Sequence, residues 1–479
     1  MEFYFALGLV TAAIAALAGL LFLKTRHLGF PVGIALLYYW SLYGAWSIVT
    51  DRIGGDSEKK FDYLTERMFP VDLDEHYMSA LVLYAGFILL IEMTLLWSVT
   101  TGANVGPRRR GRPIWISHTA IFIMAAVSLL GSLGIMAEQL TSATEMNISA
   151  YVATRGGLGA YHPLFTIHQL LNRTAIFGLA IGLAVYLAGE KGAFLRGSSS
   201  VAAGFAYAGL LLLTFGFLAM LGNKNELFSA LILGGVFYTT NTRHINWKSA
   251  MPIGIVAFLA IGAINFLRSL PVLALLDSET WWEAIAQAPE IRSSGEAFAA
   301  HFSLYGVLYF HAPLTYGASF VMLATSLVPR FYWGERSLGT YVDYAEALSI
   351  YEGPTGEAYT VHHATGWYLN FGLWGLIAGA LLLGAIWAIC YNAHCRAKIG
   401  DRGWRSMLAV IAPAGFVSFI PPLVRAGPET YKGMIIEAFI IPTVIILFTS
   451  ISWGRIFGAR AIHPPSLPDE PDPLYPGRI

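Results

Sequence analysis

Charged residues are scarce in this chain. Asp, Glu, Lys and Arg make up 13% of its 479 residues, whereas hydrophobic residues make up 56%. Because an average soluble domain carries about 25% charged residues, this composition excludes an ordinary soluble globule and predicts a polytopic membrane protein. The formal net charge is zero, and no basic block indicates a nucleic-acid partner.

Cysteine is nearly absent, and so are the motifs of many soluble enzymes. The two cysteines, Cys390 and Cys395, are separated by about 7.5 Å along a helix axis, too far for an easy disulfide, and they form no metal pattern. The sequence holds no zinc pattern, Walker loop, GxSxG elbow or CxxC pair, and its acidic run 72–75 lies in a loop without supporting context for a divalent metal. We therefore expect no metal and no cofactor, and chemistry in which protein cations stabilise a phosphate leaving group.

Long apolar runs predict an all-α fold with about eleven transmembrane helices, since a bilayer-crossing helix needs about 20 apolar residues. The runs lie near 3–23, 29–50, 78–99, 114–136, 171–189, 201–221, 226–240, 252–272, 366–391, 406–424 and 433–453. No basic residue precedes the first run, so we expect a retained helix and not a cleaved signal. No internal repeat of fixed period is visible, which gives a transporter with inverted repeats no support.

The basic residues of the loops predict the orientation. With the N-terminus outward, the inner loops include the compact basic runs 108–112 and 396–405. Residues 1–272 then hold spans one to eight, 273–365 form a large outer loop, and 366–453 hold spans nine to eleven. The proline-rich tail, 454–479, is expected to be disordered on the inner side.

The large outer loop is where we expect chemistry, because it is too long for a membrane turn and holds Arg, His and aromatic residues. Its part 297–328 predicts one or two apolar helices, interrupted at Pro313, that lie on or dip into the outer leaflet. Trp281, Trp282 and Trp333 could stack on sugar rings, but residues of this kind more often form an interfacial belt.

Several outward cations lie at the ends of spans. Arg recognises phosphate bidentately and stays charged when desolvated, so these side chains could share one lipid diphosphate whose tail remains in the bilayer. The alternative is that each one snorkels to lipid headgroups. The candidates are Arg173, Lys224, Arg268, Arg330, Arg336 and Arg425. We favour a shared site for Arg268, Arg330 and Arg425.

His362 and His363, just before span nine, are candidate general bases, because an unperturbed histidine pKa of about 6.5 suits proton transfer near neutral pH. The alternative is an interfacial histidine bonded to a backbone carbonyl. Glu357 and Glu437 are competing bases.

Two other features of the spans have functional interpretations. Glu92 falls inside span three, where an ionisable group is costly, and a structural hydrogen bond is the favoured explanation. Pro421 and Pro422 are predicted to break span ten just before Arg425, which would free backbone groups that face a cavity.

Three short motifs carry a family resemblance. The run from Pro313 to Phe320, with Val328 to Trp333, resembles the outer loop of bacterial O-antigen polymerases of the Wzy type, and so does the run from Gly366 to Gly375. The turn at 222–227 looks like the family's Gly-Ser-Arg turn, with Lys224 in place of the usual Arg. The more distant O-antigen ligases carry a histidine that His362 or His363 could match. The similarity is best over residues 220–440.

The resemblance implies a multi-helix enzyme of the bacterial inner membrane, with a periplasmic N-terminus, a cytoplasmic C-terminus and a periplasmic active site. Such enzymes transfer a growing glycan from undecaprenyl diphosphate to a hydroxyl of the incoming lipid-linked repeat unit. Expected partners are the lipid-linked oligosaccharide, membrane lipids and a chain-length regulator protein. A ligase that transfers to a lipid A core, or a transporter of lipid-linked glycan without bond chemistry, are the alternatives.

The site residues that follow are of two kinds. The catalytic candidates are His363, His362, Arg330 and Arg268, and the substrate-binding candidates are Arg425, Lys224, Arg173, Arg336, Glu357 and Tyr368.

Overall fold

A computed structural model of the chain describes residues 2–46, 75–101, 114–143, 164–198, 200–220, 224–242, 279, 282, 296–325, 361–396, 404–425 and 427–450. These residues are almost entirely helical, apart from one short pair of parallel strands, β1 (Ile114–Trp115) and β2 (Leu195–Arg196). Eight of their helical segments are long and apolar enough to cross a membrane. The protein is therefore an all-α polytopic membrane protein.

In chain order the first helices are α1 (Glu2–Thr25), α2 (Gly29–Ser41), α5 (Glu75–Ser98), α6 (His118–Ala143), α8 (Phe165–Ala188), the 3-10 turn η3 (Gly189–Lys191), α9 (Val201–Met220) and α10 (Lys224–Thr242). They are followed by α13 (Glu296–Tyr309), α14 (Ala318–Thr325), α16 (His363–Arg396), α17 (Trp404–Arg425), η5 (Pro428–Thr430), α18 (Tyr431–Gly433), the π-helix η6 (Met434–Ile440) and α19 (Ile441–Ser450). Helices α13 and α14 flank Pro313, as the sequence predicts.

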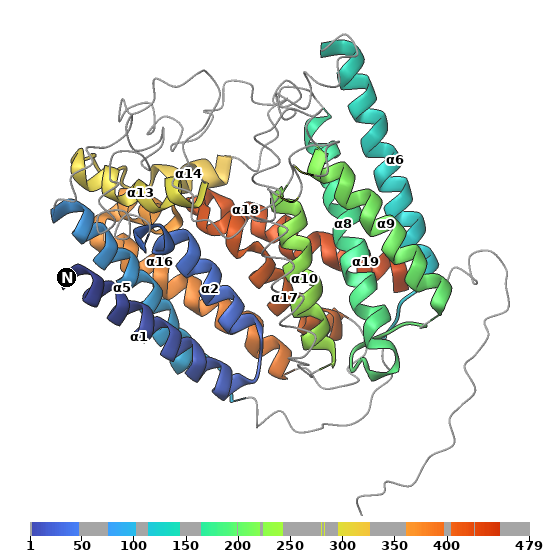
Figure 1. Cartoon of the computed structure of the whole chain (residues 1–479), viewed down its shortest axis with the longest axis horizontal. Coiled ribbons are helices and arrows are strands. Elements are labelled where there is room, and N and C mark those ends of the chain that lie inside the picture. The colour runs from blue at the N-terminus through green and yellow to red at the C-terminus, as the bar shows by residue number, and fades with distance from the viewer. Residues whose placement is uncertain are drawn as a thin grey trace, which may run out of the picture.

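The helices form two groups joined by a central pair. Helices α1, α2, α5 and α16 pack together on one side, α6, α8 and α9 pack together on the other, and α10 and α17 lie between them (Figure 1). Almost all of α17 is buried, whereas α9 presents exposed Phe205, Leu212 and Leu213 outward. A helix that is apolar all round suits both places, since lipid accepts the same side chains as a protein core.

Polar contacts define the two ends of the bundle. One end, here named the His362 end, contains the last turn of α2, the first turn of α5, the start of α16, the end of α17 and α18. The residues in contact there are Ser41, Tyr77, His362, Arg425 and Tyr431. Helices α13 and α14 cross the bundle on this side (Figure 1). The described bundle helices alternate in direction along the chain, except that α10 and α16 both run from the His362 end to the opposite end.

The opposite end, here named the Asn241 end, is closed by bonds between helix termini and loops. The Asn241 side chain accepts from the backbone N–H groups of Phe194 and Leu195 and donates to the Leu195 carbonyl. Nearby, Tyr391 donates to the Thr25 carbonyl. These bonds join the end of α10 to the loop that precedes α9, and α16 to the end of α1.

The number of spans stays a prediction. Helices α2 and α10 also run between the two ends, because Ser41 and Glu226 lie at the His362 end while His27 and Thr240 meet at the other. Neither is among the eight candidate spans of the described residues. The predicted span 252–272 lies outside the described residues, as does the tail from 454.

One prediction about α17 is wrong. Pro421 and Pro422 do not break the helix, which runs from Trp404 to Arg425 through both of them and through Pro413. A proline leaves the carbonyl four residues earlier without its N–H donor, and side chains compensate. Pro413 frees the Ala409 carbonyl, and His394 Nδ1 lies 3.1 Å from that oxygen. Neighbouring helices can re-satisfy such groups inside a membrane.

Candidate functional site

A buried hydrogen-bond network occupies the His362 end. His362 accepts at Nδ1 from the Ala364 N–H over 3.0 Å, so its proton is on Nε2, which lies 2.8 Å from Ser41 Oγ. His301, on α13, donates from Nδ1 to the Ser41 carbonyl over 2.6 Å and accepts at Nε2 from the Tyr77 hydroxyl over 2.8 Å. Both ring nitrogens of both histidines are thereby engaged.

A second set of hydroxyls extends this network. Tyr84, Ser303 and Thr365 form a triangle with oxygen separations of 3.1 and 3.2 Å from Tyr84 and 2.8 Å between the other two. Ser303 Oγ also accepts from the His362 N–H over 3.0 Å. Because all of these groups are buried, the network fixes α5, α13 and the start of α16 against one another, as satisfied buried polar networks do.

Burial keeps the histidines of the network neutral. It lowers the pKa of His301 to about 4, and it lowers the pKa of His362 well below 6.5, with the neighbouring His363 and His301 adding to the effect. The cause is the cost of placing an uncompensated charge in an apolar interior. His362 is therefore bound on both sides and insulated from water.

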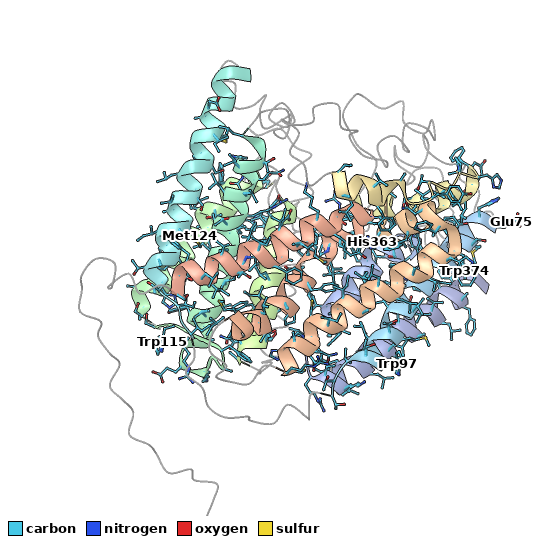
Figure 2. The ribbon with its side chains drawn as sticks, turned by 180° about the vertical axis from the view of Figure 1, so that it is seen from behind. Glu75, Trp97, Trp115, Met124, His363 and Trp374 are labelled. Atoms are coloured by element: carbon cyan, nitrogen blue, oxygen red, sulfur yellow. The ribbon has the colours of Figure 1, made fainter. Side chains whose placement is uncertain are left out.

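His363 has a different environment. It is fully buried. Figure 2 shows it among the packed helices, whereas Trp97 and Trp374 point outward. Its Nε2 accepts from Trp367 Nε1–H over 3.1 Å and lies 3.1 Å from the Tyr431 hydroxyl. Because a nitrogen that accepts from an indole N–H carries a lone pair, the proton of this neutral imidazole is on Nδ1.

Arg425 ends α17 beside this network. Its guanidinium lies over the ring of Trp40, 5.5 Å from the centroid, in cation–π geometry. Trp40 precedes Ser41, the residue that contacts both His362 and His301. The last turn of α2 thus brings one guanidinium and the histidine network to the same place.

A charged cluster lies further along the same end. Arg173 of α8 forms ion pairs with Glu437 of η6 and, over 3.3 Å, with Glu226 of α10. All three side chains are mostly buried, with 11–20% of their surface exposed. Two carboxylates therefore face one guanidinium. This cluster and Tyr431 are joined by one continuous helical stretch, because Glu437 follows Tyr431 by six residues.

Helix α16 is broken between the histidines and the membrane span. Phe371 and Gly372 have non-helical dihedral angles, and Gly372 has φ +61° and ψ −144°, a conformation that is essentially limited to glycine. The chain folds back here, and Trp367 comes close to Gly375 and Gly379. A Cβ atom at Gly375 would collide with the Trp367 carbonyl, and one at Gly379 would collide with the Trp367 ring. This turn sets Trp367, and with it His363, against the rest of the site.

The segment before α14 supports this break. The Thr315 N–H donates to the Leu369 carbonyl over 2.8 Å, and the Thr315 hydroxyl lies 3.2 Å from the Asn370 side-chain oxygen. Asn370 in turn donates to the Gly366 carbonyl. The backbone carbonyls at the end of the first part of α16 therefore accept hydrogen bonds from these donors. Non-helical backbone within a membrane protein needs such internal hydrogen-bond partners.

The predicted site residues have different outcomes. His362, His363 and Arg425 come together, and Arg173 lies apart from them in the charged cluster. Lys224 begins α10, and Tyr368 packs partly buried against Val307, Val361 and Leu369. Arg268, Arg330, Arg336 and Glu357 lie outside the described residues. Glu92 is fully buried, and neither of its oxygens has a hydrogen-bond partner among the described residues.

The sequence did not indicate several residues that contact the histidines or Arg425. Trp40 contacts Arg425, and the histidine network includes Ser41, Tyr77, Tyr84, His301, Ser303 and Tyr431. His301 and Ser303 lie in the part 297–328, for which the sequence predicts apolar helices, and a histidine on an apolar helix was the available signal. Comparisons with protein-family models, with curated proteins and with solved structures found no match to this chain.

Proposed function

We propose that this protein is a membrane glycosyltransferase that polymerises oligosaccharide repeat units carried on undecaprenyl diphosphate, and that the reaction takes place at the His362 end. The observation that carries the proposal is the position of Arg425 over Trp40, one residue from the contacts of the histidine network. A cation and candidate proton acceptors at the same helix termini match the needs of glycosyl transfer from a lipid diphosphate.

The described cations support the orientation that we propose. Lys24, Arg26, Lys191, Arg196 and Arg396 lie at the Asn241 end. Because cytoplasmic loops of membrane proteins are rich in Lys and Arg, we assign this end to the cytoplasm and the His362 end to the periplasm of a bacterial inner membrane. A lipid-linked glycan would then enter from the outer leaflet.

The diphosphate is the leaving group of the reaction. The bond between the anomeric carbon and the diphosphate oxygen breaks, its electron pair stays on that oxygen, and a new bond forms from the anomeric carbon to the acceptor hydroxyl oxygen. We assign stabilisation of the growing negative charge to Arg425, together with Arg268 and Arg330. The loss of one preorganised donor of this kind typically costs about 2.7–4 kcal/mol of transition-state stabilisation.

The proton of the acceptor hydroxyl goes to His363 in this proposal. His362 is the less suitable of the two, because its ring nitrogens are engaged with Ser41 and the Ala364 N–H. Arg173 already faces two carboxylates, so we assign it the task of holding η6 in place, and Lys224, Arg336, Glu357 and Tyr368 remain candidates for contacts with the glycan or its carrier.

The test is a synthetic lipid-diphosphate-linked repeat unit incubated with purified protein in proteoliposomes, with glycan length measured by mass spectrometry. We expect longer glycans from the wild type and a rate on the order of 10²–10³ lower from Arg425→Ala. Arg26→Ala is the matched control, because it removes an exposed cation at the opposite end. Normal extension by Arg425→Ala, Arg268→Ala and Arg330→Ala would refute the proposal. Movement across the membrane at unchanged length would identify a transporter, and growth only on a lipid A core a ligase.

A further inference from the structure

His363 is enclosed on all sides, whereas its neighbour Tyr431 is not. His363 has 0% of its surface exposed, and Trp367 has 6%. Tyr431 is only partly buried, and its hydroxyl lies 3.1 Å from His363 Nε2. A sugar hydroxyl therefore cannot reach His363 directly in this arrangement, whereas Tyr431 is a partly exposed residue in contact with it.

The bonding state of His363 suits a proton acceptor. The Trp367 N–H donates to Nε2, which places the proton of the ring on Nδ1, and the Tyr431 hydroxyl lies 3.1 Å from the same nitrogen and shares its single lone pair. The Tyr431 hydroxyl can therefore donate to Nε2 while its own oxygen lone pairs remain available to accept from another hydroxyl.

We propose that Tyr431 is a catalytic residue that touches the acceptor hydroxyl and passes its proton to His363, an inference that rests on the proposed function. The acceptor O–H bond breaks and its proton goes to the Tyr431 oxygen, while the phenolic proton goes to His363 Nε2. The acceptor oxygen bonds to the anomeric carbon, and the diphosphate leaves with the electron pair. His363 ends as an imidazolium, and the proton returns through Tyr431 to solvent.

Trp367 has a place in this transfer. Its Nε1 lies 3.1 Å from His363 Nε2 and donates to it. When Nε2 takes a proton, the indole N–H loses that acceptor and has to turn away, so the transfer displaces Trp367 from the ring nitrogen.

The position of Tyr431 is fixed from both sides. It is the first residue of α18, which follows the short turn η5 and continues into the π-helix η6. The ion pair of Arg173 with Glu437 holds η6 on the order of 9 Å further along the axis. His363 and Tyr431 also meet edge to face, with ring centroids 5.3 Å apart. Proton transfer along a single hydrogen bond requires that the donor and the acceptor are held in fixed positions, as these contacts hold Tyr431.

The experiment measures glycan extension with the full-length protein in proteoliposomes. We expect Tyr431→Phe to lower kcat on the order of 10²–10⁴, the usual contribution of a positioned acid or base, while the KM for the lipid-linked donor changes by less than about threefold. His363→Gln should lower kcat similarly. The double variant should be no slower than the slower single variant, because residues that act as one unit are not additive.

A second substitution keeps the hydroxyl and tests the proton transfer itself. We expect 3,5-difluorotyrosine at position 431, whose phenol is more acidic, to move the pH dependence of kcat to lower pH and to leave the melting temperature unchanged. An unchanged pH profile, a Tyr431→Phe variant with wild-type kcat, or additive losses in the double variant would each overturn the inference while the proposed function stands. A wild type that does not extend the glycan would overturn both.

Discussion

Acid should destabilise this protein through its buried neutral histidines, and His301 allows a measurement of the effect. His301 is 1% exposed and is held between Ser41 and Tyr77. Burial lowers its pKa from 6.5 to about 4. As the pH falls below 6.5, the unfolded chain binds a proton at this position that the folded protein does not. The free energy of unfolding therefore falls with falling pH until about pH 4.

The size of the effect follows from the shift. One pKa unit corresponds to about 1.36 kcal/mol, so His301 removes about 3 kcal/mol over the whole range and about 2 kcal/mol between pH 7.5 and pH 5. His27, which is also fully buried with a pKa of about 4, adds a similar loss. That loss is common to the wild type and to variants of His301, and it cancels in their difference.

The assay compares the wild type with His301→Gln in detergent at pH 7.5 and pH 5, with unfolding followed by tryptophan fluorescence. Glutamine can donate to the Ser41 carbonyl and accept from Tyr77, but it does not titrate. We expect the variant to be less stable at pH 7.5 and to lose about 2 kcal/mol less than the wild type on acidification. His311→Gln, which replaces an exposed histidine, is the control. An equal loss in His301→Gln and wild type would refute the reasoning.

Two further substitutions test the fold of the site by thermal unfolding. Gly372→Ala should cost on the order of 1–3 kcal/mol, because alanine is strained at this positive φ, whereas Gly86→Ala, in open space within α5, should be neutral or stabilising; equal effects would contradict the role of the turn. Arg173→Gln should cost on the order of 3 kcal/mol by leaving two carboxylates without their cation. Adding Glu437→Gln should recover part of that loss, and a purely additive result would contradict the coupling.

The apolar runs were sufficient to predict the helical class of the protein. An apolar segment of this length has few conformations other than a helix in a bilayer, since every backbone polar group must form a hydrogen bond within the segment. The helices on either side of Pro313 were predictable for the same reason, because proline interrupts the pattern locally. The count of spans depends on α2 and α10, which are not among the eight candidate spans of the described residues, and on 252–272, which lies outside those residues.

The contacts of the site could not be predicted in this way. His363 and Tyr431 are separated by 68 residues, and Ser41 and His362 by 321, so no local pattern joins them. Arg173 looked like a free cation in the sequence, and only the packing of α8 against η6 and α10 gives it two carboxylates. At Pro413, the carbonyl that the proline leaves free likewise meets a donor from another helix, His394.

The bonds at the Asn241 end have a mechanical consequence. Asn241 ties the end of α10 to the loop before α9, and Tyr391 ties α16 to the end of α1. A rearrangement that keeps these bonds therefore moves α1 and α16 as one unit, and α10 together with the loop that leads into α9 as another.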